Sequence, residues 1–198
     1  MRTGVFGGTF DPPHKGHARL ARMAERACAL DQILFIPCAR QPLKAGHPEA
    51  SAAHRCAMLA LSLDGKANWL LDTREVERRG ISYTVSTLES LRLERPDDTF
   101  FLLLGEDSFD NFARWRQPRR IIEIATLVVA KRTQNNKKWP ATLAWSDSTI
   151  FLRPRPLDVS SSGVRARIAA GRPWESMVLP AVARYINRQG LYKQRRSG

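Results

Sequence analysis

The sequence predicts an α/β fold in which one doubly wound, mostly parallel sheet forms a single domain. Short apolar runs alternate with segments of helical periodicity along the chain, the pattern of repeated β-α-β units. A length of 198 residues suits one such domain, and a hydrophobic content of 43% supports a substantial core. A glycine-rich turn joins the first predicted strand to the first predicted helix, as in the phosphate sites of parallel sheets.

Each predicted strand is a compact apolar run. The first, 2–6, leads into Gly7, and the second, 33–37, is closed by a proline. The other predicted strands are 69–71, 99–104, 126–130 and 149–152, and the charged segment 74–79 is compatible with an edge strand. Because ligands of open α/β sheets bind at the carboxyl ends of strands, the residues that follow the strands are the candidate site.

The predicted helices alternate with these strands. Residues 18–30 mix Ala, Leu, Arg and Met, and Ser51 is a suitable N-cap for a helix over 52–63. Further helices are expected over 85–93, 121–124, 163–170 and 179–188, whereas 38–49, 133–148 and 153–156 are expected to be loops or connectors. We expect the helical part 160–192 to pack on the same domain, and 193–198 to form a basic tail.

The most informative stretch is Gly7-Gly8-Thr9-Phe10-Asp11-Pro12-Pro13-His14-Lys15-Gly16-His17, between the first strand and the first helix. Glycines let the backbone approach an anion, and a helix N-terminus offers N–H donors and a favourable dipole. His14 and His17 are three residues apart, so they face one side of the first helical turn. Protonated imidazoles there can donate hydrogen bonds to the oxygens of a reacting phosphate.

Three interpretations of this stretch stay open from the residues alone: a surface turn with two histidines, a metal-binding histidine pair, or a phosphate or nucleotide site. Zinc needs at least a third protein ligand, and neither His47 nor His54 lies in a ligand-type cluster. The stretch is neither the G-x-G-x-x-G fingerprint nor a P-loop. We favour the phosphate site and expect no metal held by the protein.

Composition narrows the class of partner. The formal charge of +13 suits a polyanion, either a nucleotide or a nucleic acid. The basic residues are dispersed without interleaved aromatics, so we expect no nucleic-acid partner. No apolar run approaches the roughly 18 residues of a membrane span, and the unpaired spacing of Cys28, Cys38 and Cys56 suggests reduced thiols in a cytoplasmic protein. A homo-oligomer remains compatible with the sequence.

The glycine-histidine stretch resembles the opening motif of the nucleotidylyltransferase superfamily, and more narrowly that of the bacterial nicotinate-nucleotide adenylyltransferases. The resemblance extends from Gly7 to Tyr192, with four motifs in the family's order. It implies a Rossmann-like fold and the transfer of AMP from ATP to nicotinate mononucleotide, giving deamido-NAD and pyrophosphate. It further implies Mg²⁺ carried with ATP and direct in-line attack on the α-phosphate.

The resemblance implies an ATP site formed mainly by the first and last motifs. His14 and His17 face the ATP phosphates, and Lys44 helps one phosphate approach another. The stretch 160–165 matches the late motif, whose serines and Arg165 hold the leaving pyrophosphate, although from the residues alone it also fits a plain N-cap with a solvated arginine. The other residues expected around ATP are Gly7, Gly8, Thr9, Phe10, Gly16, Gly105, Asp107, Arg132, Ser160, Ser161 and Ser162.

Two middle motifs imply a site for nicotinate mononucleotide. Ser82-Tyr83-Thr84 matches a family motif that holds the nicotinate ring and carboxylate, and from the residues alone it also fits an ordinary helix cap. Trp115 can stack on a pyridinium ring or serve as a core or lid aromatic, and Arg116 lies next to the expected carboxylate.

The chain departs from the family pattern at two places near this second site. Leu43 replaces a histidine before Lys44, with asparagines absent upstream, and Ser86 replaces an aspartate. The nearest alternatives are therefore transferases acting on nicotinamide mononucleotide or phosphopantetheine, and a basic nucleic-acid-binding protein is a distant one.

Overall fold

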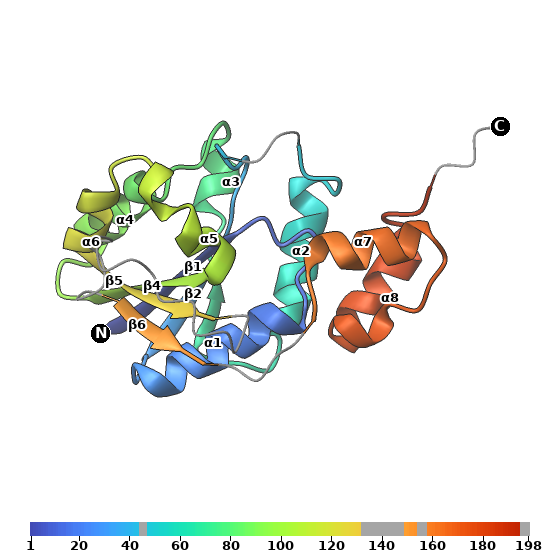
Figure 1. The fold of residues 1–198 in the computed structure, drawn as a ribbon, viewed down its shortest axis with the longest axis horizontal. Coiled ribbons are helices and arrows are strands. Elements are labelled where there is room, and N and C mark those ends of the chain that lie inside the picture. The colour runs from blue at the N-terminus through green and yellow to red at the C-terminus, as the bar shows by residue number, and fades with distance from the viewer. Residues whose placement is uncertain (44–46, 132–148, 154–157, 195–198) are drawn as a thin grey trace.

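The computed structural model describes residues 1–43, 47–131, 149–153 and 158–194, and within them six strands form one parallel sheet (Figure 1). The strand order is β3-β2-β1-β4-β5-β6, and each pair of neighbouring strands is parallel, which confirms the predicted doubly wound sheet. The strands are β1 (Arg2–Gly8), β2 (Gln32–Pro37), β3 (Trp69–Leu71), β4 (Thr99–Gly105), β5 (Ala125–Ala130) and β6 (Thr149–Leu152).

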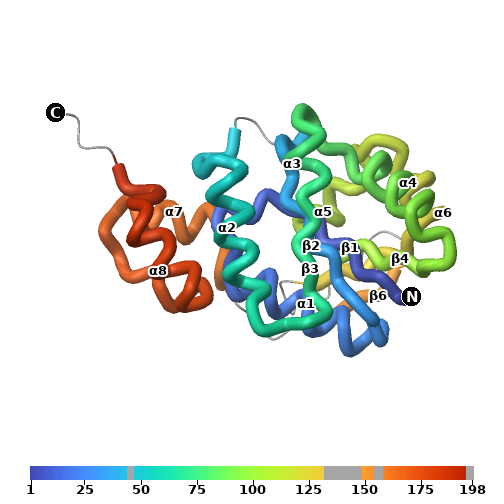
Figure 2. Tube along the Cα trace, turned by 180° about the vertical axis from the view of Figure 1, so that it is seen from behind, coloured from blue at the N-terminus to red at the C-terminus, as the bar shows by residue number. Residues whose placement is uncertain are grey.

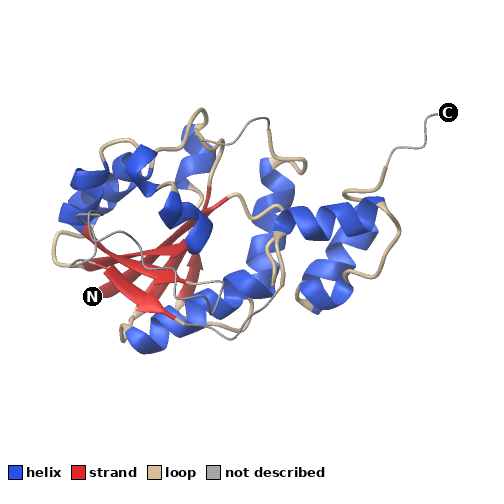
Figure 3. Cartoon of the chain, viewed as in Figure 1, coloured by secondary structure: helices blue, strands red, loops and turns tan. Residues whose placement is uncertain are grey.

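Helices lie on both faces of this sheet (Figure 3). The α-helices are α1 (Lys15–Ala27), α2 (Ala52–Leu63), α3 (Arg74–Arg78), α4 (Thr84–Glu94), α5 (Glu106–Asp110), α6 (Pro118–Ile124), α7 (Ser161–Ala169) and α8 (Pro180–Gln189), and two described 3-10 helices are η1 (Phe112–Arg114) and η3 (Glu175–Met177). No described helix has both the length and the apolar character that a membrane crossing requires.

Some predicted elements differ from the structure in type or in their first residue. The segment 74–79 is not an edge strand: α3 occupies it, with Glu75 buried and its carboxylate accepting a hydrogen bond from Thr87 (2.6 Å). The first helix begins at Lys15 rather than at residue 18, because His14 acts as its N-cap. Helix α4 similarly begins at Thr84, one residue before the predicted start.

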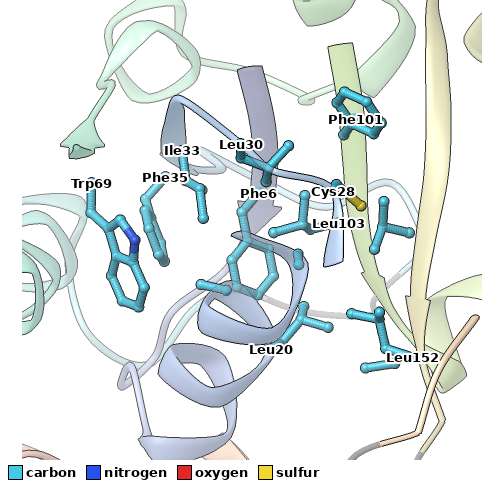
Figure 4. Packing of buried hydrophobic residues seen from close by; sticks show 14 of the residues in the cluster. Phe6, Leu20, Cys28, Leu30, Ile33, Phe35, Trp69, Phe101, Leu103 and Leu152 are labelled. Atoms are coloured by element: carbon cyan, nitrogen blue, oxygen red, sulfur yellow. The ribbon is translucent and has the colours of Figure 1, made fainter. Parts of the chain in front are cut away.

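Alternation along the strands divides the core between the two faces. Val5 packs with α4, α5 and α6 side chains on one face, while Phe6 packs with α1 and α2 side chains on the other. Figure 4 shows the second cluster, where the rings of Phe6 and Phe35 lie 5.4 Å apart and those of Phe35 and Trp69 5.3 Å apart. Each fully buried side chain of this size contributes about 1.5–3 kcal/mol of hydrophobic stabilisation.

A third hydrophobic cluster joins the C-terminal helices to the sheet domain through α2. Met58 of α2 packs with α7 and α8, whereas its neighbour Leu59 packs toward the sheet. Figure 2 shows the result from behind, with α2 between the sheet and the α7–α8 pair. Helix α2 therefore holds α7 in a position where the N-terminus of α7 meets the segment after β1.

The parallel sheet also fixes where a ligand can bind. The chain winds outward in both directions from β1 and β4, which are neighbours in the sheet. In open parallel sheets, ligands bind outside the carboxyl ends of the strands at this point of reversal. The residues after Gly8 and around Gly105 therefore mark the candidate site independently of any motif.

Candidate active site

Backbone glycines leave open space at the point of reversal. A Cβ added to Gly7, near the end of β1, or to Gly105, at the end of β4, would meet no heavy atom within 4 Å. Neither glycine is therefore required by a close contact with the protein's own described atoms. Open backbone at the carboxyl ends of two adjacent strands suits the approach of a bound ligand.

Gly8 has a different role, because it makes room for Phe10. A Cβ at Gly8 would stand 3.0 Å from the tip of the Phe10 ring. Phe10 is 1% exposed and has a left-handed backbone (φ 49°). Its ring lies edge-on to the imidazole of His17, with 4.9 Å between the centroids. The strained backbone of the loop is therefore held by packing that positions one of the two histidines.

The two histidines form a reciprocal cap at the start of α1. His14 Nδ1 accepts a hydrogen bond from the Gly16 N–H (3.1 Å), and His17 Nδ1 accepts one from the His14 N–H (3.1 Å). Their rings stack with centroids 3.7 Å apart. A Cβ at Gly16 would come within 2.9 Å of the His14 ring, so glycine is required for this cap.

This cap confirms that the histidines face one side, and it shows that two of the helix N–H groups already have partners within the protein. The Gly16 N–H bonds to His14, and the His17 N–H bonds to the His14 carbonyl, so these groups are not available to an anion. Because both Nδ1 atoms accept, each ring in this arrangement bears a hydrogen on Nε2. The cap therefore orients the Nε2–H group of each imidazole as a candidate donor to an anion.

Helix α7 docks directly on this loop. The Ser161 hydroxyl donates to the Pro12 carbonyl (2.9 Å), and Arg165 Nη1 donates to the Asp11 carbonyl (2.8 Å). Ser160 caps α7 by accepting from the Gly163 N–H (3.0 Å), and its hydroxyl lies 3.2 Å from that of Ser162. The structure thus brings the first and last motifs together, as the resemblance implies.

Asp11 lies at the centre of the contact between this loop and α7. Nothing in the sequence distinguished it from the other residues of its motif. Its carboxylate is 2% exposed and accepts from the backbone N–H groups of Glu49 (2.8 Å) and Ala50 (3.1 Å) and from the Tyr192 hydroxyl (2.7 Å). Arg165 Nε also donates to Glu49 (2.6 Å). Burial, and then the negative charge of Asp11, raise the pKa of Tyr192, so the phenol stays protonated.

Ser82-Tyr83-Thr84 does not cap α4 through a side chain. Tyr83 is the N-cap residue without a side-chain cap bond, and the Ser82 hydroxyl instead accepts from the Ala39 N–H (3.0 Å). The ordinary cap interpretation of Ser82 was therefore wrong. Its N–H donates to the Arg40 carbonyl (2.9 Å), so Ser82 ties the start of α4 to the segment after β2.

The tryptophan motif reaches the same region. The Arg116 guanidinium lies over the Tyr83 ring, 4.8 Å from its centroid, and Trp115 is half-buried with its ring 5.4 Å from that of Phe112. Two motifs that are 30 residues apart thus share one place. An aromatic and cationic surface of this kind suits a flat ring that carries a negatively charged substituent.

The segment after β2 connects this region to the phosphate loop. Next to Ala39, the Cys38 N–H donates to the Gly8 carbonyl (2.9 Å), and the Cys38 thiol lies 3.7 Å from the Thr9 hydroxyl. The contacts therefore run continuously from Gly8 and Thr9 through Cys38 and Ala39 to Ser82. All three cysteines lie in the described part of the chain, and none of them is in a disulfide bond there.

The remaining candidates have mixed outcomes. Asp107 is exposed in the first turn of α5, immediately after Gly105, and Thr84 opens α4. Lys44 and Arg132 lie outside the described residues. Among the residues that are described, no group of three or more His, Cys, Asp and Glu side chains is arranged to hold a metal ion.

Comparison with known proteins places this chain in a family. The cytidylyltransferase-like family model matches residues 5–167. A protein of Gemmatimonas aurantiaca named as a probable nicotinate-nucleotide adenylyltransferase is 40% identical, covering 98% of this chain and 93% of its own length. A protein of Thermomicrobium roseum with the same name is 38% identical, covering 97% and 92%. The chain belongs to the nicotinate-nucleotide adenylyltransferase family.

Solved structures agree with the nicotinate-nucleotide adenylyltransferase fold. The Plasmodium falciparum nicotinic acid mononucleotide adenylyltransferase complexed with APC superposes with a TM-score of 0.80 at 17% identity, covering 96% of each chain. The same enzyme complexed with NaAD gives a TM-score of 0.79. These likenesses confirm the Rossmann-like nucleotidyltransferase fold.

Proposed function

We propose that this chain transfers AMP from ATP to nicotinate mononucleotide, giving deamido-NAD and pyrophosphate. The observation that carries the proposal is the assembly at the β1–β4 edge. The loop after β1, with its glycines and two imidazoles, meets the N-terminus of α7 and Arg165 there. A series of contacts connects this loop to a second group of side chains, Tyr83, Trp115 and Arg116. The names of the relatives support the same reaction.

The chemistry requires positioning and charge stabilisation rather than a protein nucleophile. An oxygen of the acceptor's 5′-phosphate attacks the α-phosphorus of ATP, the bond from that phosphorus to the bridging oxygen breaks, and pyrophosphate leaves. His14 and His17 donate from Nε2 to the oxygens of the α-phosphate, where negative charge increases in the transition state. Lys44 helps the two phosphates approach each other.

Arg165 and the serines hold the departing pyrophosphate. The first two N–H groups of α7, at Ser161 and Ser162, have no intrahelical acceptor, and the positive end of the helix dipole favours an anion there. Arg165 adds a charged fork in the second turn. ATP enters with a divalent cation, which we take to be Mg²⁺ bound to its phosphates and water, because Mg²⁺ keeps most of its own ligands.

The acceptor lies on the aromatic side of the site. Trp115 stacks on the pyridine ring, while Arg116, Tyr83, Thr84 and Ser82 surround its carboxylate. The adenosine is bordered by Gly105, Asp107 and Arg132, and the glycine loop with Thr9, Phe10 and Gly16 faces the phosphates. We place the reaction in the cytoplasm, where the free thiols remain reduced.

The fate of labelled phosphate tests the reaction type. With ATP labelled at the α-phosphate, nicotinate mononucleotide and Mg²⁺, the label should appear in the dinucleotide, and with γ-labelled ATP it should appear in pyrophosphate. Label passing from the γ-position to the acceptor, with ADP as the second product, would show phosphoryl transfer and contradict the proposal. If a dinucleotide formed only with nicotinamide mononucleotide, the acceptor would be that amide and not nicotinate mononucleotide.

A further inference from the structure

A buried arginine lies directly behind the phosphate loop. Arg55 of α2 is 1% exposed, and its Nη1 donates to the Thr9 carbonyl (2.8 Å). Its Nε is buried without a hydrogen-bond partner. Within the described part of the chain, no carboxylate forms an ion pair with it. Arg55 is therefore a buried positive charge held by one carbonyl.

Such an arrangement is unfavourable for folding alone. Removing a guanidinium from water is costly unless opposite charge and a full set of hydrogen bonds replace the solvent. The neighbouring positions Met58 and Leu59 show that α2 packs well with apolar side chains in the same helix. An apolar residue at position 55 would remove the desolvation cost, so the reason for an arginine lies elsewhere.

The single hydrogen bond acts on the peptide between Thr9 and Phe10, in the loop after β1. The Thr9 carbonyl and the Phe10 N–H belong to one planar trans peptide, in which they point in opposite directions. Arg55 fixes the carbonyl end, so the Phe10 N–H is turned away from α2. That N–H has no hydrogen-bond acceptor among the described residues, and Phe10 holds a left-handed backbone. The peptide is thus held in one orientation with its donor unused.

We propose that Arg55 is a positioning residue for the adenylyl transfer: it fixes the Thr9–Phe10 peptide so that the Phe10 N–H donates to a phosphate oxygen. The bound phosphates then supply the negative charge that Arg55 lacks in the free protein, transmitted through the polarised peptide. This proposal rests on the proposed function, since it assumes that a phosphate binds this loop. It assigns to Arg55 no contact with the substrate.

The test compares Arg55→Met with Arg55→Lys. In Arg55→Met the midpoint of thermal unfolding should stay the same or rise, while turnover in the pyrophosphate-release assay falls by more than about tenfold, as for the loss of one oriented donor. The stabilisation of the protein by inorganic triphosphate, measured as a shift of that midpoint, should fall to less than half. Arg55→Lys keeps a charge and a donor for the Thr9 carbonyl and should restore most of the triphosphate shift.

Arg74→Met is the matched control. Arg74 binds Asp72 and Glu94 through three hydrogen bonds and touches no proposed ligand, so its loss should lower the midpoint without changing the triphosphate shift. Unchanged turnover in Arg55→Met would overturn the proposal. A midpoint that falls by more than about 5 °C together with activity would also overturn it, because a structural role would then suffice. A wild type that gains stability from triphosphate but forms no dinucleotide would instead refute the proposed function.

Discussion

At the scale of single residues, His14 and His17 are defined by the bonds they make to the backbone. Each imidazole accepts a hydrogen bond at Nδ1 from a main-chain N–H, which orients the ring and leaves a hydrogen on Nε2. The cap at the start of α1 and the candidate phosphate donors are therefore the same two side chains. A substitution at either position changes both helix capping and chemistry, unless the replacement preserves the cap.

His17→Gln separates these two roles. Glutamine at the third helical position can still accept from the N-cap N–H, as in a capping box, but it provides no imidazole. We expect turnover to fall by more than about tenfold, while the midpoint of thermal unfolding stays close to that of the wild type. Steady-state pyrophosphate release and a thermal melt measure the two effects.

His17→Ala is the control for the cap. It should lose activity to a similar degree and also lose about 1 kcal/mol of stability, because the acceptor for the His14 N–H is removed. If His17→Gln kept full turnover, His17 would be a capping residue only, and its assigned role at the α-phosphate would be wrong.

Arg116 is the residue that we expect to favour an acid over an amide acceptor. Its guanidinium lies over Tyr83 at the surface where the pyridine carboxylate is expected. Arg116→Gln should raise the KM for nicotinate mononucleotide by about tenfold, through loss of a charge-assisted contact. The KM for nicotinamide mononucleotide should change little, and an equal rise for both acceptors would count against this role.

At the scale of elements, the segment after β1 depends on contacts from distant parts of the chain. The Asp11 carboxylate accepts a hydrogen bond from the hydroxyl of Tyr192, which follows α8. It also accepts from the N–H groups of Glu49 and Ala50, which precede α2. Arg165 of α7 binds the Asp11 carbonyl on the other side. The loop that carries the histidines is thus anchored by segments up to 181 residues away.

Tyr192→Phe tests this anchoring through its dependence on pH. The pKa of the buried phenol is raised above the value of 10.0 that applies in the unfolded chain, so its protonated form stabilises the fold. Removing the hydroxyl should lower the free energy of unfolding by about 1.5 kcal/mol below pH 10, as for a hydrogen bond to a charged group. Above pH 10 the unfolded wild type loses this proton first, so the difference between the two proteins should shrink.

Urea denaturation at pH 8 and pH 10.5 measures that difference. A gap that stays constant between the two pH values would mean that the phenol titrates alike in the folded and unfolded states. In that case the bond to Asp11 would not contribute as described.

Most elements could be predicted from the sequence, because apolar runs and capping residues are local signals. The failures have identifiable physical reasons. The segment 74–79 alternates in polarity like an edge strand, yet Glu75 is buried where Thr87 supplies a hydrogen bond that no local pattern reveals. The first helix starts earlier than predicted. Its N-cap is a histidine rather than the usual Ser, Thr, Asp or Asn, so the sequence carried no ordinary capping signal there.

At the scale of the whole molecule, α2 links two hydrophobic cores. Its Met58 belongs to the cluster of α7 and α8, and Leu59 belongs to the cluster under the sheet. Because one rigid helix serves both clusters, we expect the C-terminal helices and the sheet to unfold together. Arg55 on the same helix connects both to the phosphate loop.

Met58→Ala tests this coupling. Met58 is fully buried, so the truncation should cost about 3 kcal/mol. A single calorimetric transition should shift to lower temperature as a whole. Two separate transitions, with the sheet unfolding at the temperature of the wild type, would show that the part 160–192 is an independent unit.

The sequence predicted which residues form the candidate site better than it predicted the contacts between them. The motifs supplied the histidines, the serines with Arg165, and Tyr83 with Trp115 and Arg116. Arg55, Tyr192 and the hydrogen bond from the Ala39 N–H to the Ser82 hydroxyl depend on contacts made only after folding. Nothing in the sequence distinguishes a buried arginine in a helix from a solvated one. The resemblance at the C-terminus includes Tyr192, so that residue could have been marked from the sequence as part of the site.

The most direct measurement is the kcat/KM for pyrophosphate release with ATP and Mg²⁺, comparing nicotinate mononucleotide, nicotinamide mononucleotide and phosphopantetheine at equal enzyme concentration. We expect nicotinate mononucleotide to be preferred by at least about tenfold, corresponding to one charge-assisted contact with its carboxylate. That result would show that Leu43 and Ala39 are tolerated beside the acceptor. A preference for either other acceptor, or no release with any of them, would contradict the assignment of the Tyr83–Trp115–Arg116 surface to nicotinate.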